Sequence, residues 1–320
     1  MGKVDNTIGE TLRFALLLAR KGSLRVAPPD YSRRHAHTLE EIPRNVFDPG
    51  ASQAHRRPGS IKTKLLSVPF IRLVAGNLTF LRNPEKSYAQ FFVSDEQKLA
   101  YIRILKCGST SVLRSFLPLV HKPFENYPLK ASSIDSIAHY LVRHTLSDTS
   151  DYVIFSVTRN PLERLVSAYL DVFNPPHSYP EIPFNIFRSC RTFKDVVKLL
   201  DRIPDRYRGP HFVSQTRILG LLKGRDVLRF DLDASGQDTR LEHFLNAHGM
   251  AMHRENPYGT PYDFRTFYDT ETLELAYRIY ERDFEMLGYK RAYLDLKEAL
   301  QSGWSGRLYE PTSAEGPTSS

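Results

Sequence analysis

The sequence predicts an α/β fold in which a mainly parallel sheet is flanked by helices within a single main domain. Three runs have the composition of short buried strands, and segments with helical periodicity lie between and after them: residues 101–105, 152–157 and 227–230. Strands that alternate with helices favour right-handed crossovers and therefore parallel pairing. Ligands of such sheets bind at the carboxyl ends of the strands, so the residues that follow each strand are the candidate site.

The first strand leads into a loop of phosphate-binding character. Residues 101–105 are apolar or aromatic apart from one arginine, and from Thr110 the apolar positions follow the period of a helix. The junction between them is Lys106, Cys107, Gly108, Ser109, Thr110 and Ser111. Amides of a helix's first turn bind anions, Gly108 permits close approach and Lys106 adds a positive charge. The lysine precedes a single glycine, unlike the usual P-loop, and an ordinary helix cap at Ser109 or Thr110 is the alternative.

The second strand repeats this arrangement. Arg159 follows residues 152–157, Asn160 is placed to cap the next helix, and Pro161 suits the first helical position because its missing N–H is not needed there. Ser167 lies seven residues after Asn160, or two helical turns. We therefore expect the Arg159 guanidinium and the Ser167 hydroxyl to reach one phosphate together.

The remaining elements complete the domain. Helical patterns occur near residues 192–200 and 240–247, on either side of the third strand. A long helix is predicted from about Glu271 to Leu287, with Asp269 or Thr270 as its cap and Gly288 at its end. Its apolar stripe predicts a core-facing surface rather than a cofactor site.

The composition of the chain predicts its domain boundaries. The chain of 320 residues is 41% apolar and 25% charged, as expected of a globular protein with a sizeable core. We expect a basic N-terminal arm over residues 1–62, a domain over residues 63–295 and a disordered tail over residues 296–320, which is rich in Ser, Gly, Pro and Thr. The net charge is +8. The basic surplus of the arm suits an anionic partner or a solvated extension.

Composition also excludes several classes of protein. Cys107 and Cys190 provide neither a disulfide framework nor metal-ligand spacing, so we expect no metal and a reducing compartment. No apolar run reaches the roughly 20 residues of a membrane span, and a secretory signal is poorly matched. We expect a soluble, cytoplasmic protein with no integral membrane segment. No aromatic platform, helix-turn-helix or zinc finger indicates nucleic-acid binding.

The two junctions, Lys106 to Ser111 and Arg159 to Tyr169, resemble the cofactor motifs of the carbohydrate sulfotransferases of the family-2 type, and the likeness covers roughly residues 95–290. The resemblance implies a P-loop-like sulfotransferase fold and the sulfuryl donor 3′-phosphoadenosine 5′-phosphosulfate (PAPS). The first loop would bind the 5′-phosphosulfate, and Arg159 with Ser167 would bind the 3′-phosphate. Lys106 would also be catalytic, neutralising charge on the bridging oxygen. Leu105 and Cys107 depart from the family pattern.

The acceptor hydroxyl must lose a proton, and a histidine or glutamate near the sulfur would take it. His139 and His144 lie between the two motifs. We prefer His144 as the catalytic base because it precedes the second strand. His211 and Glu163 are competing candidates.

The resemblance therefore implies an enzyme, a PAPS-dependent sulfotransferase that acts on a hydroxyl of a carbohydrate or glycoconjugate acceptor, anionic acceptors included. One alternative is a nucleotide-dependent kinase on the same fold. Another is a polyanion-binding protein without catalysis, whose binding would depend steeply on salt.

Overall fold

The computed structural model describes residues 82–120, 134, 137–138, 141–146, 150–173, 187, 190–232, 239–252 and 262–304. The predicted N-terminal arm, the candidate His139 and residues 305–320 of the predicted tail lie outside this part of the chain.

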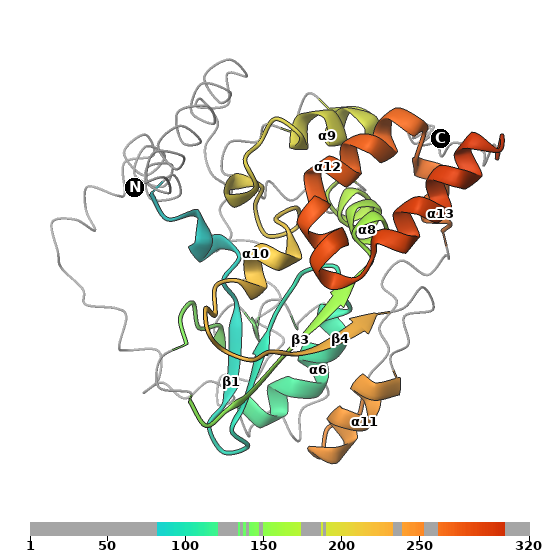
Figure 1. Ribbon diagram of the computed structural model, residues 1–320. Helices are drawn as coiled ribbons and strands as arrows, with labels where there is room; N and C mark the ends of the chain where they lie inside the picture. Colours follow the sequence, from blue (N-terminus) through green and yellow to red (C-terminus); the bar gives the residue numbers. More distant parts are fainter. Residues whose placement is uncertain are drawn as a thin grey trace, which may run out of the picture.

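The centre of the fold is a four-stranded sheet in the order β1-β2-β3-β4 (Figure 1). Its strands are β1 (Phe91–Ser94), β2 (Leu99–Ile102), β3 (Val153–Arg159) and β4 (Leu228–Leu232). Strands β2, β3 and β4 run parallel, and β1 pairs antiparallel with β2. The register aligns Arg159 with Leu232, so β3 and β4 end at the same edge of the sheet. The predicted mainly parallel sheet is confirmed.

Helices follow the strands as the sequence predicts. Those in the described residues are α6 (Ser109–Val120), α8 (Pro161–Phe173), α9 (Phe193–Leu200), α10 (Gln215–Leu219), α11 (Thr239–Ala247), α12 (Thr270–Leu287) and α13 (Lys290–Gln301), with the 3₁₀ helices η4 (Pro84–Ser87), η7 (Asp205–Tyr207) and η8 (Phe264–Phe267). The Asp269 side chain accepts from the backbone N–H of Thr272 and so caps α12. Gly288 ends α12 with a left-handed φ of 85°.

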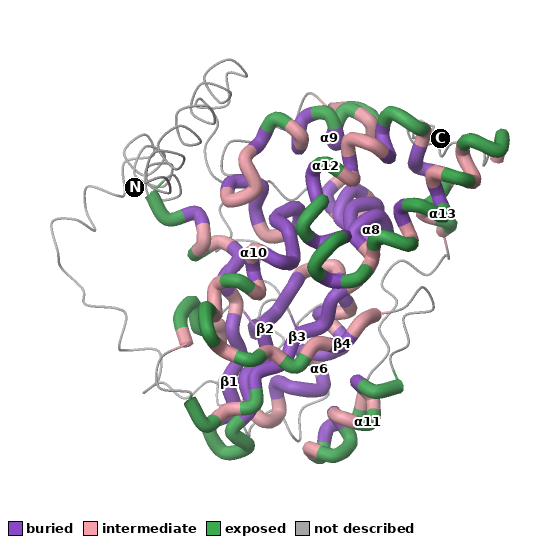
Figure 2. The backbone as a smooth tube through the Cα atoms, in the orientation of Figure 1, coloured by how far each residue is buried: buried purple, intermediate pink, exposed green. Residues whose placement is uncertain are grey.

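The buried apolar residues form two hydrophobic clusters. Figure 2 shows the buried positions in purple. The sheet cluster joins the strands to α6 and α11, and its centre is Phe155, whose ring lies 5.7 Å from Phe116 of α6 and 5.0 Å from Phe244 of α11. The helical cluster joins α8, α9, α12 and α13, which gather on the other side of the sheet's carboxyl edge in Figure 1. Helix α8 starts directly after β3 and enters the helical cluster. The carboxyl edge of the sheet therefore lies where the two clusters meet.

Three elements differ from the prediction. Strand β1, the five-residue helix α10 and helix α13 have no predicted counterpart. Helix α13 runs to Gln301, past residue 295, where the domain was predicted to end. Residues 296–301 are therefore helical rather than part of a disordered tail. The reason is packing, since Leu296 is 3% exposed and the Tyr293 ring stacks 4.2 Å from that of Tyr277 in α12.

Candidate functional site

The loop after β2 turns tightly into α6. Lys106 and Gly108 both have left-handed backbones, with φ of 68° and 66°. A Cβ at Gly108 would lie 3.5 Å from the Leu232 side chain at the end of β4. The backbone of this loop therefore lies against the neighbouring strand end, and the glycine avoids the strain that a side chain would add there.

Cys107 points into the protein. Its side chain is fully buried, and its Sγ lies 3.3 Å from Oε1 of Gln215, to which the thiol donates. Burial raises the pKa of the Cys107 thiol to about 11, so the thiol remains protonated at neutral pH. Of the predicted cofactor-binding residues, Cys107 can therefore meet a ligand only through its backbone.

The hydroxyl residues of the loop begin α6. The helix starts at Ser109, with Thr110 and Ser111 in its first turn, and Ser109 and Ser111 are buried. Val112 donates its N–H to the carbonyl of Gly108 at 3.1 Å. The loop thus leads into a twelve-residue helix whose amide dipoles favour an anion at this end.

The junction after β3 contacts the first loop. Asn160 Oδ1 accepts from the Leu162 N–H at 3.1 Å, and α8 begins at Pro161, as predicted. Arg159 donates from Nε to Glu163 Oε2 at 3.1 Å and from Nη1 to the carbonyl oxygen of Lys106 at 3.4 Å. The two predicted anion-binding segments, 53 residues apart in sequence, therefore touch at the sheet edge.

One face of α8 connects the predicted phosphate ligands. Glu163, Ser167 and Asp171 are spaced four residues apart, so they lie along one side of the helix. Asp171 Oδ2 accepts from Lys106 Nζ at 3.2 Å, while Glu163 holds Arg159. Ser167 lies between these two carboxylates on the helix. The structure therefore brings Lys106, Arg159 and Ser167 to one place.

Each cation of the site is paired with a carboxylate. The Lys106 and Asp171 side chains are 13% and 16% exposed, and Arg159 and Glu163 are 20% and 8% exposed. The ions are thus accessible from one side but shielded enough for their charges to interact strongly. An anion that enters this site must share Lys106 with Asp171.

Arg164 anchors the first loop from α8. Its side chain is 1% exposed, and it donates from Nε to the carbonyl of Leu105 at 3.0 Å and from Nη1 to the carbonyl of Val213 at 2.9 Å. No role was predicted for Arg164, although it belongs to the motif that begins at Arg159. Its buried charge satisfies backbone carbonyls and does not face a ligand.

Gln215 connects the two loops and was also missed. Its Oε1 accepts from the Arg159 N–H at 2.9 Å and from the Cys107 thiol, and its Nε2 donates to the Arg159 carbonyl at 2.8 Å. Gln215 is fully buried at the start of α10. Gln215 lies within the range of the family resemblance, but it carries no charge and lies 108 positions from Cys107, so its contacts with the two loops were not predicted.

The candidate bases lie in different surroundings. His211 Nε2 lies 3.1 Å from Asp171 Oδ2, and burial lowers the pKa of this histidine although Asp171 opposes the shift. His144 is exposed, and its Nδ1 donates to the Ala89 carbonyl at 2.8 Å. That bond leaves the lone pair of the neutral ring on Nε2. Arg143, the preceding residue, bridges to Phe91, which pairs with Ile102 at the carboxyl end of β2.

The part of the chain that the structure describes contains neither a metal-binding cluster nor a membrane-spanning helix. No group of three or more His, Cys, Asp or Glu side chains in this part of the chain is placed to hold a metal ion. None of its helices combines the length and the apolar character needed to cross a bilayer.

Residues 89–220 match the family model described as "Sulfotransferase family". No curated protein and no solved structure matches the chain. The matched range contains both loops, the helix face of α8, His211 and Gln215. This match, over the segment that builds the site, supports placing the chain in a sulfotransferase family.

Proposed function

We propose that the chain is a PAPS-dependent sulfotransferase that transfers a sulfuryl group to a hydroxyl of a carbohydrate or glycoconjugate. The observation that carries the proposal is the contact between the Arg159 guanidinium and the Lys106 carbonyl at 3.4 Å. This contact joins the segments after β2 and β3 at the carboxyl edge of the parallel sheet, where ligands of this fold class bind, and so supports one shared donor site.

The residues of the site fit a nucleotide with two separated anionic groups. The loop from Lys106 to Ser111 would hold the 5′-phosphosulfate through the α6 amides, the hydroxyls and Lys106. Arg159 and Ser167 would hold the 3′-phosphate, since a guanidinium and a hydroxyl both donate to phosphate oxygens. The donor supplies an activated sulfuryl group, and the protein supplies its position and the opposing charge.

Lys106 and His144 have the chemical roles in this proposal. The Lys106 ammonium stabilises negative charge on the oxygen that links phosphate to sulfur, which is the electrostatic contribution expected in such transfers. His144 Nε2, with its lone pair fixed by the Nδ1 hydrogen bond to Ala89, accepts the proton of the acceptor hydroxyl. The Nδ1 of His211 is buried by comparison, so His211 has a less accessible lone pair.

Calorimetric titration with adenosine 3′,5′-bisphosphate tests the proposed ligand. We expect the wild type to bind it more tightly than ATP with Mg²⁺, and Arg159→Ala to weaken binding about 10- to 100-fold, because charge-assisted hydrogen bonds to phosphate are lost. Arg265→Ala is the matched control, since Arg265 is exposed and forms an ion pair with Asp263. Absence of binding by the wild type, or equal affinities in wild type and Arg159→Ala, would contradict the proposal.

A further inference from the structure

Gln215 is the one side chain that hydrogen-bonds to both loops among the described contacts of the site. We propose that Gln215 is a positioning residue that sets the separation of the two phosphate-binding segments, and so determines how well one nucleotide can bridge them. The inference rests on the proposed function, because it concerns the spacing of the two halves of that donor site.

The chemistry at Arg159 requires an amide. Gln215 Oε1 accepts the Arg159 N–H at 2.9 Å, and Gln215 Nε2 donates to the Arg159 carbonyl at 2.8 Å. A carboxylate of the same length would lack the donor, and an apolar side chain would lack both groups. The second lone pair of Oε1 accepts the Cys107 thiol, which joins the first loop to the same amide.

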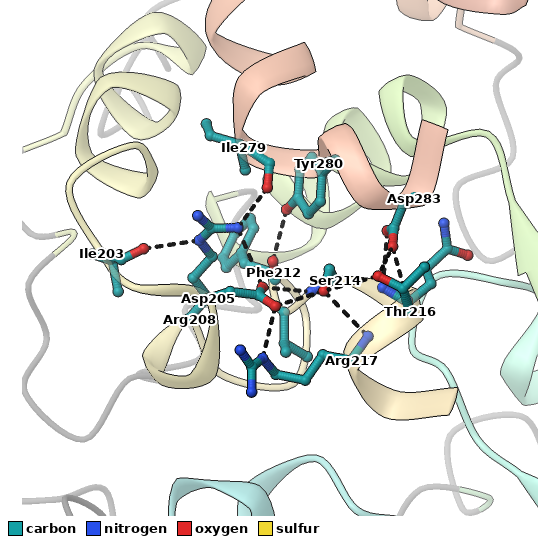
Figure 3. Close-up of polar contacts among 12 residues, drawn as sticks. Ile203, Asp205, Arg208, Phe212, Ser214, Thr216, Arg217, Ile279, Tyr280 and Asp283 are labelled. Atoms are coloured by element: carbon teal, nitrogen blue, oxygen red, sulfur yellow. Dashed lines mark hydrogen bonds and ion pairs between the residues drawn. The ribbon is translucent and has the colours of Figure 1, made fainter. Parts of the chain in front are cut away.

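The backbone of Gln215 is held from α12. Asp283, which is fully buried, accepts the Gln215 N–H at 2.9 Å through Oδ2. Its Oδ1 accepts the Thr216 N–H and the Thr216 hydroxyl, each at 2.8 Å (Figure 3). Burial raises the pKa of Asp283, and the three hydrogen bonds offset only part of that effect. They fix the first turn of α10.

Ser214, the residue before Gln215, is held by hydrogen bonds to Asp205. Ser214 donates its N–H and its hydroxyl to the two oxygens of Asp205, at 2.8 Å and 2.6 Å. Arg208 and Arg217 donate to the same carboxylate (Figure 3). Burial alone would raise the pKa of Asp205, but Arg208, Ser214 and Arg217 outweigh it and hold the pKa below its ordinary value. Asp205 is therefore a charged anchor at neutral pH.

The same network reaches the kink of α12. Tyr280 has a non-helical backbone, and the carbonyl of the preceding Ile279 accepts from Arg208 Nη1 at 2.8 Å. The Tyr280 hydroxyl donates to the carbonyl of Phe212 at 2.8 Å (Figure 3). Helix α12 thus holds residues 205–216 at several points, and the Gln215 amide extends from this fixed segment to the two loops.

A spacing role has a specific consequence for binding. When one ligand joins two anionic groups, the second contact gains an effective concentration that depends on the distance between the two binding segments. A change in that distance costs a bridging ligand more than it costs a ligand that uses one segment. A purely structural role would weaken all such ligands alike.

The experiment measures three nucleotides by calorimetry: adenosine 3′,5′-bisphosphate, adenosine 5′-monophosphate and adenosine 3′-monophosphate. We expect the wild type to prefer the bisphosphate to both monophosphates. In Gln215→Met, which keeps length but removes the amide, that preference falls about tenfold, while the affinity for each monophosphate changes less than about threefold. Equal weakening of all three nucleotides, or an unchanged preference, would overturn the inference.

Three further variants separate the effect of Gln215 on binding from any loss of stability. Leu296→Ala, in α13, destabilises the helical cluster without touching the site, and we expect it to keep the full preference for the bisphosphate. Cys107→Ala removes only the thiol donor and should lower the preference by a smaller factor, whereas Cys107→Ser keeps a donor and should retain it. If Gln215→Met does not fold, the two Cys107 variants test the inference instead. An identical preference for the bisphosphate in Cys107→Ala and Cys107→Ser would overturn it. A wild type without preference for the bisphosphate would instead contradict the proposed function.

Discussion

Asp171 Oδ2 lies 3.2 Å from Lys106 Nζ, so this carboxylate would compete with the proposed nucleotide for the Lys106 ammonium. We predict that Asp171→Asn binds adenosine 3′,5′-bisphosphate about three- to tenfold more tightly, because it removes a negative charge from an anion site and keeps an oxygen for His211. Calorimetry measures the change. Asp201→Asn, which breaks a surface pair with Arg278, is the control and should leave the affinity unchanged. Weaker binding by Asp171→Asn would mean that the carboxylate positions Lys106 for the ligand.

The proposed catalytic base is a single residue, His144. We predict that His144→Ala lowers kcat about 10²- to 10⁴-fold with little change in bisphosphate affinity, because general-base catalysis contributes that much and the exposed ring binds no cofactor group in this account. His243→Ala, at an exposed position on α11, is the matched control. The measurement is the steady-state rate of sulfated product formation in each variant. A normal rate in His144→Ala would assign the proton to another group.

At the scale of elements, two glycines with left-handed backbones separate a structural role from a ligand-binding role. Gly108 and Gly288 have φ of 66° and 85°. We predict that alanine at either position lowers the free energy of unfolding by about 1 kcal/mol, because both substitutions impose the same kind of backbone strain. A Cβ at Gly288 would meet no atom within 4 Å, so strain alone acts there.

The two variants should differ in binding. Gly108→Ala is expected to weaken bisphosphate binding as well, since the backbone of the loop must approach the ligand, whereas Gly288→Ala should bind normally. Chemical denaturation and calorimetry measure the two effects. Unimpaired binding by Gly108→Ala would show that the loop does not contact the nucleotide.

The elements that local chemistry specifies are the ones that sequence predicts well. Asn160 and Pro161 begin α8, and Asp269 and Gly288 bound α12, as their capping preferences indicate. The missed elements lack such signals. Helix α10 is too short to show a period, and the register of β1 is set by its pairing with β2. Helix α13 was not predicted, because its stability comes from its packing against α12 rather than from a local signal.

Some residues of the candidate site were likewise predicted from the sequence, and others were not. The sequence singled out Lys106, Arg159 and Ser167 because strand ends and helix starts attract phosphate ligands, and the fold brings them together. It could not indicate Asp171, whose importance comes from where α8 runs, or Gln215, which makes contacts between segments distant in the chain. Charged residues and glycines form recognisable local patterns, but a buried amide that bonds to a distant backbone and a distant thiol does not.

At the scale of the whole molecule, the candidate site lies where the sheet cluster and the helical cluster meet. The first loop belongs to the sheet cluster through Cys107 and α6, and α8 carries Ser167 and Asp171 into the helical cluster. Residues 205–216 and α12 hold the two halves in register through Asp205, Gln215 and Asp283. This arrangement favours a ligand that contacts both halves, as the proposed donor does.

The most direct test of the account is transfer itself. The protein is incubated with PAPS and a mixture of glycans, and the products are analysed by mass spectrometry, with Lys106→Ala and Arg265→Ala as comparison variants. We predict that wild type and Arg265→Ala add a sulfuryl group to a glycan, while Lys106→Ala loses turnover but keeps most of its thermal stability. Absence of sulfated product with the wild type across carbohydrate acceptors, or full turnover by Lys106→Ala, would contradict the account.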